Sequence, residues 1–376
     1  MTRHSTENVD RLFDWLALER IPRVGPLSIA RLLEAFGSPR EAMKADAKQI
    51  RARTGLSENL ASAIAGSVPR EKEILNDIET LHRLGAKLLT RWDEKYPTNL
   101  RDIYDPPALL FVRGEIIEAD TKAVAMVGTR KPSHYGLKVA MRFAQDLASA
   151  GITVISGLAK GIDTACHKAA LEAGGRTIGV LGCGIDVVYP KKNRSLVEDI
   201  VSAGAVITEF RPGLEPLPTN FYRRNRVVSG LSKGVVVVQS SLKSGSLITA
   251  NHAVDQGREV FAVPGSIAVE MSRGPHKLLK EGAALAESAQ EIIETLFAEV
   301  TVVPQQADFG FETAELDLTD TMSRVLAGLD PDPIPIDLLC ESLKMAAGKL
   351  SGVLLELELK GLVKQYPGKQ FGLISK

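Results

Sequence analysis

The sequence is poor in cysteine and in aromatic residues and has no net charge. Its 376 residues include three cysteines, 5% aromatic residues, and 46 basic against 46 acidic side chains. Cys166, Cys183 and Cys340 form no CxxC pair, which excludes a disulfide scaffold and is typical of the reducing cytoplasm. No apolar run is long enough to span a bilayer, and residues 1–11 are polar. We therefore expect a cytoplasmic protein that makes no contact with a membrane.

Sequence motifs of several enzyme classes are missing as well. No GxGxxG follows the first predicted strand, no Walker A motif is present, and the six histidines lack metal-ligand spacing. We therefore expect no cofactor and no metal. Residues 230–234, GLSKG, match the GxSxG of serine hydrolases, but a helix is predicted before this serine and a strand after it. This order is the reverse of a nucleophile elbow, so the match carries no prediction of hydrolysis.

The neutral total hides a basic central region. Residues 121–250 contain 17 Lys and Arg against 8 Asp and Glu, a local balance of +9, so the remainder carries −9. A neutral protein with one basic domain can bind a polyanion there, although a solvated charged surface would give the same count.

Six apolar, β-branched runs in that region predict an α/β domain. They lie at 123–127, 153–155, 177–181, 205–207, 235–238 and 260–263, and helix-like segments separate most of them. Buried strands that alternate with helices indicate a Rossmann-like, mostly parallel sheet with helices on both faces. Ligands of such sheets bind beyond the carboxyl ends of the strands, so the loops after these runs are the candidate site.

Flanking segments predict two smaller domains. Residues 9–68 read as several short helices, and the turn at 21–28 is typical of a helix-hairpin-helix or SAM-like unit. That turn can contact a DNA phosphate or serve only as a structural cap. Residues 319–376 follow a winged-helix pattern, whose recognition helix at 346–359 carries only Lys349 near its start, so protein contact is favoured over DNA reading. The predicted domains are 1–70, 71–300 and 319–376, with a linker at 301–318.

Three arginines and an asparagine are concentrated in residues 221–226, FYRRNR, and a small-residue turn follows at 244–250, SGSLITA. Guanidinium groups and open backbone N–H groups suit phosphate recognition. Arg130, in the loop after the first strand, adds a cation at the same edge, unless it pairs with a carboxylate on the rim. Phe221 and Tyr222 can stack on bases or pack beneath the loop.

One further pair of residues has two possible roles. Asp163 precedes a predicted helix, and His167 follows one turn later on the same face. Asp163 can cap that helix, or the two can form an acid/base pair, for which the sequence offers no nucleophile.

Taken jointly and in order, several motifs resemble those of the DNA-processing protein A family (DprA, also called Smf). They are VGTRxPSxYG at 127–136, SGLAxGIDxxxH at 156–167, YP at 189–190, RNR at 224–226, SGSLITA at 244–250 and GRxVxAVPG at 257–265. The resemblance covers roughly residues 95–285. It implies a homodimer that binds single-stranded DNA without strong sequence preference and loads RecA recombinase in natural transformation.

The resemblance and the loop positions give the expected DNA-binding residues and no catalytic residue. The set is Arg130, Lys160, Lys191, Tyr222, Arg223, Arg224, Asn225, Arg226, Lys243, Ser244, Gly245 and Ser246. The sequence departs from the family at Gln239 and Ser240, where relatives usually have Glu-Ala. The alternative function is a Rossmann-like enzyme that binds or cleaves nucleotides, for which Glu209 is the remaining candidate carboxylate.

Overall fold

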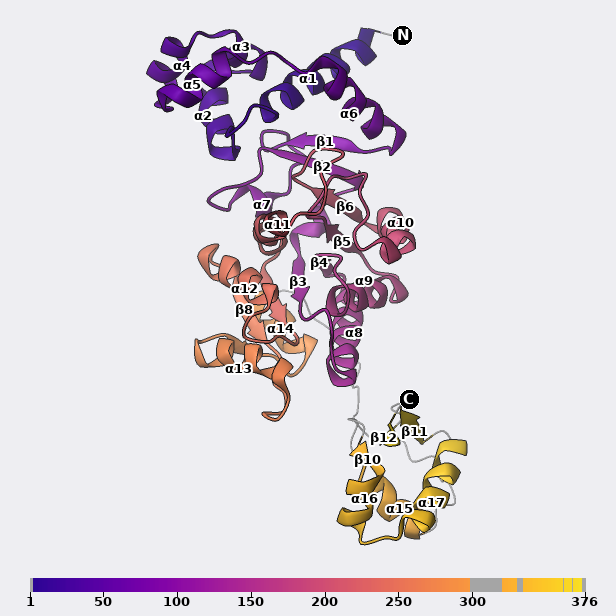
Figure 1. Ribbon diagram of the computed structural model, residues 1–376. Coiled ribbons are helices and arrows are strands. Elements are labelled where there is room, and N and C mark those ends of the chain that lie inside the picture. Colours follow the sequence, from indigo (N-terminus) through magenta and orange to yellow (C-terminus); the bar gives the residue numbers. More distant parts are fainter. Residues whose placement is uncertain (1–2, 298–319, 330–333, 361, 367, 374–376) are drawn as a thin grey trace. The chain divides into compact units, whose positions relative to one another are not determined.

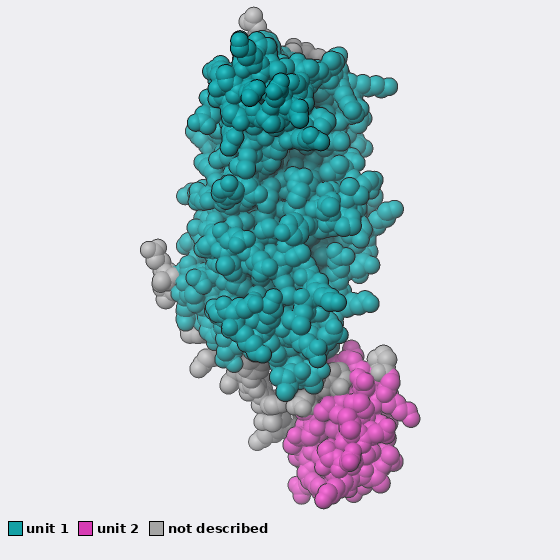
Figure 2. Space-filling view, turned by 60° about the vertical axis from the view of Figure 1, so that its left-hand side comes forward, with its two compact units in different colours: residues 1–301 teal, residues 302–376 magenta. Residues whose placement is uncertain are grey.

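The structure is a computed structural model that describes residues 3–297, 320–329, 334–360, 362–366 and 368–373. The chain divides into two compact units, residues 1–301 and 302–376 (Figure 2). The predicted linker at 301–318 lies outside the described residues. Within the described ranges, no helix has the length and apolar composition of a membrane span, and no three metal-ligating side chains come together.

The first unit begins with the short helices that the sequence predicts, drawn in indigo in Figure 1. They are α1 (Arg3–Glu19), α2 (Pro26–Phe36), α3 (Pro39–Lys44), α4 (Ala47–Thr54), α5 (Glu58–Ala65) and α6 (Glu71–Arg83). Side chains of Ser38, Asp46 and Ser57 accept hydrogen bonds from the first turns of α3, α4 and α5, which explains why three helices begin in so short a stretch.

A nine-stranded sheet follows. Its strands are β1 (Lys87–Thr90), β2 (Leu109–Gly114), β3 (Ala123–Val127), β4 (Thr153–Ser156), β5 (Thr177–Val180), β6 (Ala205–Thr208), β7 (Gly234–Val237), β8 (Glu259–Ala262) and β9 (Ala284–Leu285). The spatial order is β1-β2-β6-β5-β4-β3-β7-β8-β9. Strands β3 to β9 are parallel, whereas β2 pairs antiparallel with β1 and β6. All six predicted runs are strands, which confirms the mostly parallel sheet.

Helices cover both faces of this sheet (Figure 1). On one side lie α8 (His134–Ser149), α9 (Ile162–Glu172) and α10 (Arg194–Ala203), and on the other lie α7 (Thr98–Arg101), α11 (Pro218–Gly230) and α12 (Gly245–Asp255). Helices α13 (Arg273–Lys280) and α14 (Ala289–Leu296) complete the unit. Buried Leu100, Val228 and Ala250 of α7, α11 and α12 meet Val127 and Ile155 of the sheet in one apolar core.

The N-terminal helices and the sheet share a second apolar cluster. Leu16 of α1 and Ile74 of α6 pack with Leu181 and Ile185, which belong to the segment after β5. A buried ion pair between Arg20, which directly follows α1, and Asp77 of α6 joins these two helices. The N-terminal helices are therefore held against the loops at the carboxyl ends of the strands.

The second unit is a winged helix, as the sequence predicts. It contains α15 (Asp320–Ala327), α16 (Ile336–Leu343), α17 (Ala347–Leu359) and a three-stranded sheet in the order β10-β12-β11. The strands are β10 (Ile334–Pro335), β11 (Val363–Tyr366) and β12 (Gln370–Leu373), and Val325, Leu350 and Phe371 contribute to the core. The sequence did not indicate β10. Gly361 and Pro367, at the predicted wing, lie outside the described residues.

Candidate functional site

The parallel strands reverse their order between β3 and β7, and the loops after these strands meet there. The N–H of Thr129 donates to the carbonyl of Gln239 at 2.7 Å, and the N–H of Ile162 donates to the carbonyl of Thr129 at 3.3 Å. A Cβ at Gly161, where φ is +82°, would overlap the Thr129 carbonyl. Three loops, after β3, β4 and β7, therefore form one continuous rim at the switch point where ligands of open α/β sheets bind.

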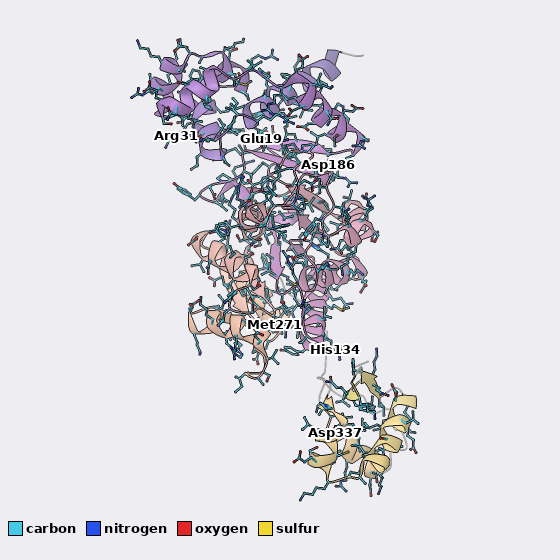
Figure 3. All side chains as sticks on the ribbon, viewed as in Figure 1. Glu19, Arg31, His134, Asp186, Met271 and Asp337 are labelled. Carbon is cyan, nitrogen blue, oxygen red and sulfur yellow. The ribbon has the colours of Figure 1, made fainter. Side chains whose placement is uncertain are left out.

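The side chain of Gln239 connects the end of β7 to the start of α8. Its carboxamide accepts a hydrogen bond from Ser133 N and donates one to Ser133 Oγ, both at 2.9 Å, while Ser133 caps α8. A Cβ at Gly136 would overlap the same carboxamide. Figure 3 labels two residues beside this rim: His134 at the start of α8, and Met271, whose carbonyl accepts from Ser240 N at 2.7 Å. The departure from the family pattern at Gln239 thus has a structural role, and no carboxylate stands at this strand end.

Arg224 lies beneath the rim instead of facing a phosphate. It is only 6% exposed, and its Nη1 donates to the carbonyls of Gly157 and Val180 at 2.5 and 2.6 Å. Its Nε donates to Asn225 Oδ1, and Asn225 Nδ2 donates to the Gly245 carbonyl. The guanidinium thus links the ends of β4 and β5 to α11, and Asn225 extends the link to α12. DNA contact by Arg224 stays a prediction from the sequence, while the side chain has a structural role in the fold.

Arg226 is also occupied inside the protein. Its Nη2 donates to Glu209 Oε2 at 2.6 Å, its Nη1 donates to the Asp105 carbonyl at 2.8 Å, and its Nε lies 3.3 Å from Asp105 Oδ2. Arg223 shares the same Glu209 oxygen at 3.2 Å, but its side chain remains 52% exposed. Burial raises the pKa of Glu209, and the two guanidinium groups oppose that rise. Of the three arginines in 221–226, only Arg223 faces solvent.

Phe221 packs against two guanidinium groups and one aromatic ring. The guanidinium carbons of Arg130 and Arg224 each lie 5.8 Å from its ring centroid, and the Tyr189 ring lies 5.6 Å away. Tyr222 points outward, is 56% exposed, and makes an edge contact with His252 at 5.5 Å between centroids. Phe221 is therefore a packed support, whereas Tyr222 is available for stacking.

The turn at 244–246 has fewer open amides than the sequence suggested. The N–H of Ser244 donates to the Ser241 carbonyl at 3.2 Å, and that of Ser246 donates to Ser244 Oγ at 3.3 Å. Ser246 is buried, and its hydroxyl donates to Ser240 Oγ at 2.9 Å. Gly245 is exposed, and a Cβ added there would lie in open space. The turn is chiefly an N-cap for α12, and Gly245 is its exposed residue.

Four predicted cations on the rim have no carboxylate partner among the described residues. Arg130, Lys160, Lys191 and Lys243 are exposed and follow β3, β4, β5 and β7. None of them makes an ion pair with a carboxylate in the part of the chain that the structure describes. For Arg130 this removes the alternative of a partner carboxylate on the rim. Tyr189, 42% exposed beside Lys191, is a further rim aromatic that the sequence analysis used only as a family motif.

The acid/base pair of Asp163 and His167 does not form. Asp163 lies inside the first turn of α9 and accepts from the N–H groups of Gly157 and Ala159, so it ties the preceding loop instead of capping the helix. His167 Nδ1 lies 2.6 Å from Thr177 Oγ1, whose own hydrogen goes to a carbonyl. Burial lowers the pKa of His167 to about 3, so the ring is uncharged at neutral pH.

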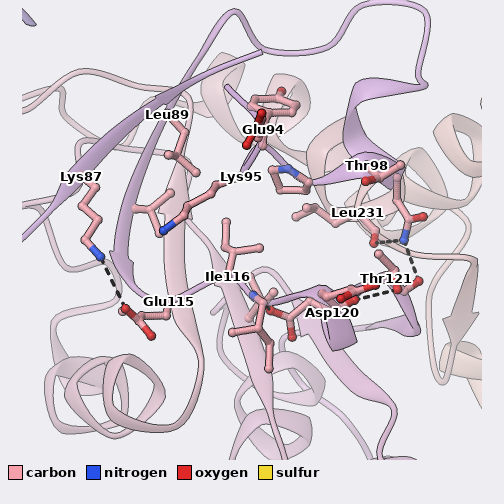
Figure 4. A pocket seen from close by; sticks show the side chains of 18 residues that line it. Lys87, Leu89, Glu94, Lys95, Thr98, Glu115, Ile116, Asp120, Thr121 and Leu231 are labelled. Carbon is pink, nitrogen blue, oxygen red and sulfur yellow. Dashed lines mark hydrogen bonds and ion pairs between the residues drawn. The ribbon is translucent and has the colours of Figure 1, made fainter. Parts of the chain in front are cut away.

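A separate cavity of about 520 Å³ lies away from this rim (Figure 4). It is bounded by Lys87 and Leu89 of β1 and by Thr121 and Leu231, which precede β3 and β7. It therefore opens near the amino ends of the parallel strands. Lys87 and Glu115 pair across its edge at 3.5 Å. None of the predicted site residues lines it.

Comparison with known proteins gives three family matches, which cover successive parts of the chain. The family described as DNA recombination-mediator protein A matches residues 87–297, which is more than half of the chain. A DprA-like N-terminal HHH domain matches residues 9–73, and a DprA winged helix domain matches residues 311–369.

Individual relatives agree with these matches. The chain is 39% identical over 317 residues to protein Smf of Escherichia coli, covering 84% of both chains. The X-ray structure of DNA processing protein A from Streptococcus pneumoniae superposes with a TM-score of 0.64 at 33% identity, covering 80% of this chain and 99% of that one. DNA processing protein A from Helicobacter pylori, reported for its single-stranded DNA binding mode, gives 0.52 at 31% identity, covering 57% and 97%. The chain therefore belongs to the DNA recombination-mediator protein A (DprA/Smf) family.

Proposed function

We propose that this protein binds single-stranded DNA without sequence preference at the rim formed by the loops after β3, β4, β5 and β7. The observation that carries the proposal is the group of four exposed cations without carboxylate partners, Arg130, Lys160, Lys191 and Lys243, beside exposed Tyr222. Cations hold phosphates irrespective of sequence, and an aromatic ring stacks on any base. Arg223 adds a partly neutralised cation at the same place.

We further propose that the bound strand is passed to RecA recombinase by a cytoplasmic homodimer. The family description as a recombination mediator and the single-strand binding of the Helicobacter pylori relative support this role. A winged-helix unit whose α17 has a single basic residue near its start, Lys349, suits protein contact better than DNA reading.

A nucleotide-cleaving enzyme is the weaker alternative. Such chemistry needs a carboxylate that can reach the substrate. Glu209 is buried and shared by Arg223 and Arg226, and the neighbouring strand end carries Gln239, which holds the cap of α8. Neither residue is presented at the rim, so we assign no catalytic residue.

Replacement of Arg130 by alanine should weaken binding to oligo-dT and to mixed-sequence single strands alike. The side chain is exposed and has no ion pair with a carboxylate of the described residues, so its loss removes about one phosphate contact. The slope of log K against log salt should then fall by roughly 0.7 for a single strand. Fluorescence anisotropy across a salt series measures both effects. Lys122→Ala is the matched control, because Lys122 is also an exposed cation but precedes β3, at the end of the strand opposite to Arg130. If both variants bind like the wild type, the rim is not the DNA site.

A further inference from the structure

Tyr104 is an unusually exposed aromatic side chain, at 87%. It lies in the turn between α7 and β2, which runs beside α11 (Figure 1). Single exposed apolar residues are common, but an almost fully exposed tyrosine gains little from packing within its own chain. The contacts of the neighbouring residues, and not those of the ring itself, therefore hold Tyr104 in this position.

The residues on either side of Tyr104 are fixed. Ile103 is buried and lies close to α11, because a Cβ added at Gly230 of that helix would contact its side chain. The Asp105 carbonyl and carboxylate are both held by Arg226, at 2.8 and 3.3 Å. The backbone is thus anchored before and after the tyrosine, so its ring is presented to solvent from a rigid turn and not from a loose loop. Rigid aromatic side chains are favoured contact residues because little conformational entropy is lost on binding.

The anchor also ties the turn of Tyr104 to α11, the helix that carries Tyr222. Arg226 and Tyr222 are four residues apart on α11, so they share one face of that helix. Arg226 holds Asp105, the neighbour of Tyr104, while Tyr222 is exposed beside Arg223. Two exposed tyrosines therefore lie on either side of Arg226: Tyr222 on the rim, and Tyr104 in the turn that Arg226 holds.

We propose that Tyr104 is a second stacking residue, on which a base of the bound single strand rests after the strand passes Tyr222. The inference rests on the proposed single-strand binding and extends its path over α11. A base is the favoured contact, and not a phosphate, because the neighbouring residue Asp105 is a carboxylate and the Arg226 side chain beside it is already paired with Asp105 and Glu209. Stacking tolerates every base, which agrees with binding that ignores sequence.

The test uses the full chain and labelled oligo-dT of two lengths, about 4 and about 16 nucleotides, which bracket the usual range of site sizes. Tyr104→Ala should leave the affinity for the short oligonucleotide unchanged and weaken that for the long one roughly tenfold, as expected for one lost base stack. Tyr104→Phe keeps the ring and should restore the long-oligonucleotide affinity. Because the side chain is exposed, neither change should alter folding.

Ile117→Ala, an exposed apolar residue that lines the cavity near the amino ends of the strands, is the matched control. Equal affinity of Tyr104→Ala and wild type for the long oligonucleotide would overturn the second stacking site while leaving rim binding intact. A loss of the same size at both lengths would also overturn it, since the tyrosine would then act within the rim itself. Absence of binding by the wild type would instead reject the proposed function.

Discussion

Arg224→Met should lower the free energy of unfolding of the first unit by about 2–4 kcal/mol. The substitution keeps much of the side-chain volume but leaves the carbonyls of Gly157 and Val180 buried without their donor. It also removes the cation that acts on the buried carboxylate of Asp163. Urea unfolding followed by circular dichroism measures the change, since a shift of the midpoint without a change of slope reports stability alone.

Arg223→Met is the matched control for this variant. It lies on the same helix, but its side chain is half exposed, so the loss of its ion pair should cost no more than about 1 kcal/mol. Equal stability of Arg224→Met and wild type would contradict the structural role of the buried guanidinium. It would restore Arg224 as a residue free to contact phosphate.

Glu209→Ala should cost about 3–5 kcal/mol of unfolding free energy, the largest effect expected of a single substitution here. The carboxylate is the shared partner of Arg226 at 2.6 Å and Arg223 at 3.2 Å. Without it, the buried Arg226 retains only Asp105, which is itself at the surface turn. Thermal unfolding at fixed protein concentration measures the loss.

Glu209→Gln separates the contribution of the carboxylate charge from that of its hydrogen bonds. The amide retains an oxygen acceptor for the two guanidinium groups but loses the charge, so stability should fall by less than in Glu209→Ala. Wild-type stability of Glu209→Ala would contradict the account of the ion pair and return Glu209 to the group of candidate catalytic residues.

The sheet and the winged helix were predictable because their signals are local. A run such as 235–238, four valines bounded by glycine and polar residues, has few alternatives to a buried strand. The loops that follow such runs at the carboxyl edge were predictable for the same reason, because parallel strands place them together. The exposed positions of Arg130, Lys160, Lys191 and Lys243 on these loops follow from this rule, and their contact with DNA stays a proposal.

The internal contacts of the site were not predictable from sequence. The sequence does not distinguish three arginines in one helix segment from one another. Only the rotation of α11 against the sheet decides that Arg224 points to Gly157 and Arg223 to solvent. Gln239 looked like a departure from a family pattern, yet its role depends on Ser133, 106 residues away. Tyr104 has no motif at all, because its exposure results from the anchoring of both neighbours.

Fluorescence anisotropy of a labelled oligo-dT and of a matched duplex, at low and at moderate salt, tests the central claim most directly. Single-strand binding at the rim predicts tight binding to oligo-dT, weaker binding to the duplex, and a steep decrease of affinity with salt. Failure to bind either nucleic acid, or equal affinity for both, would contradict it.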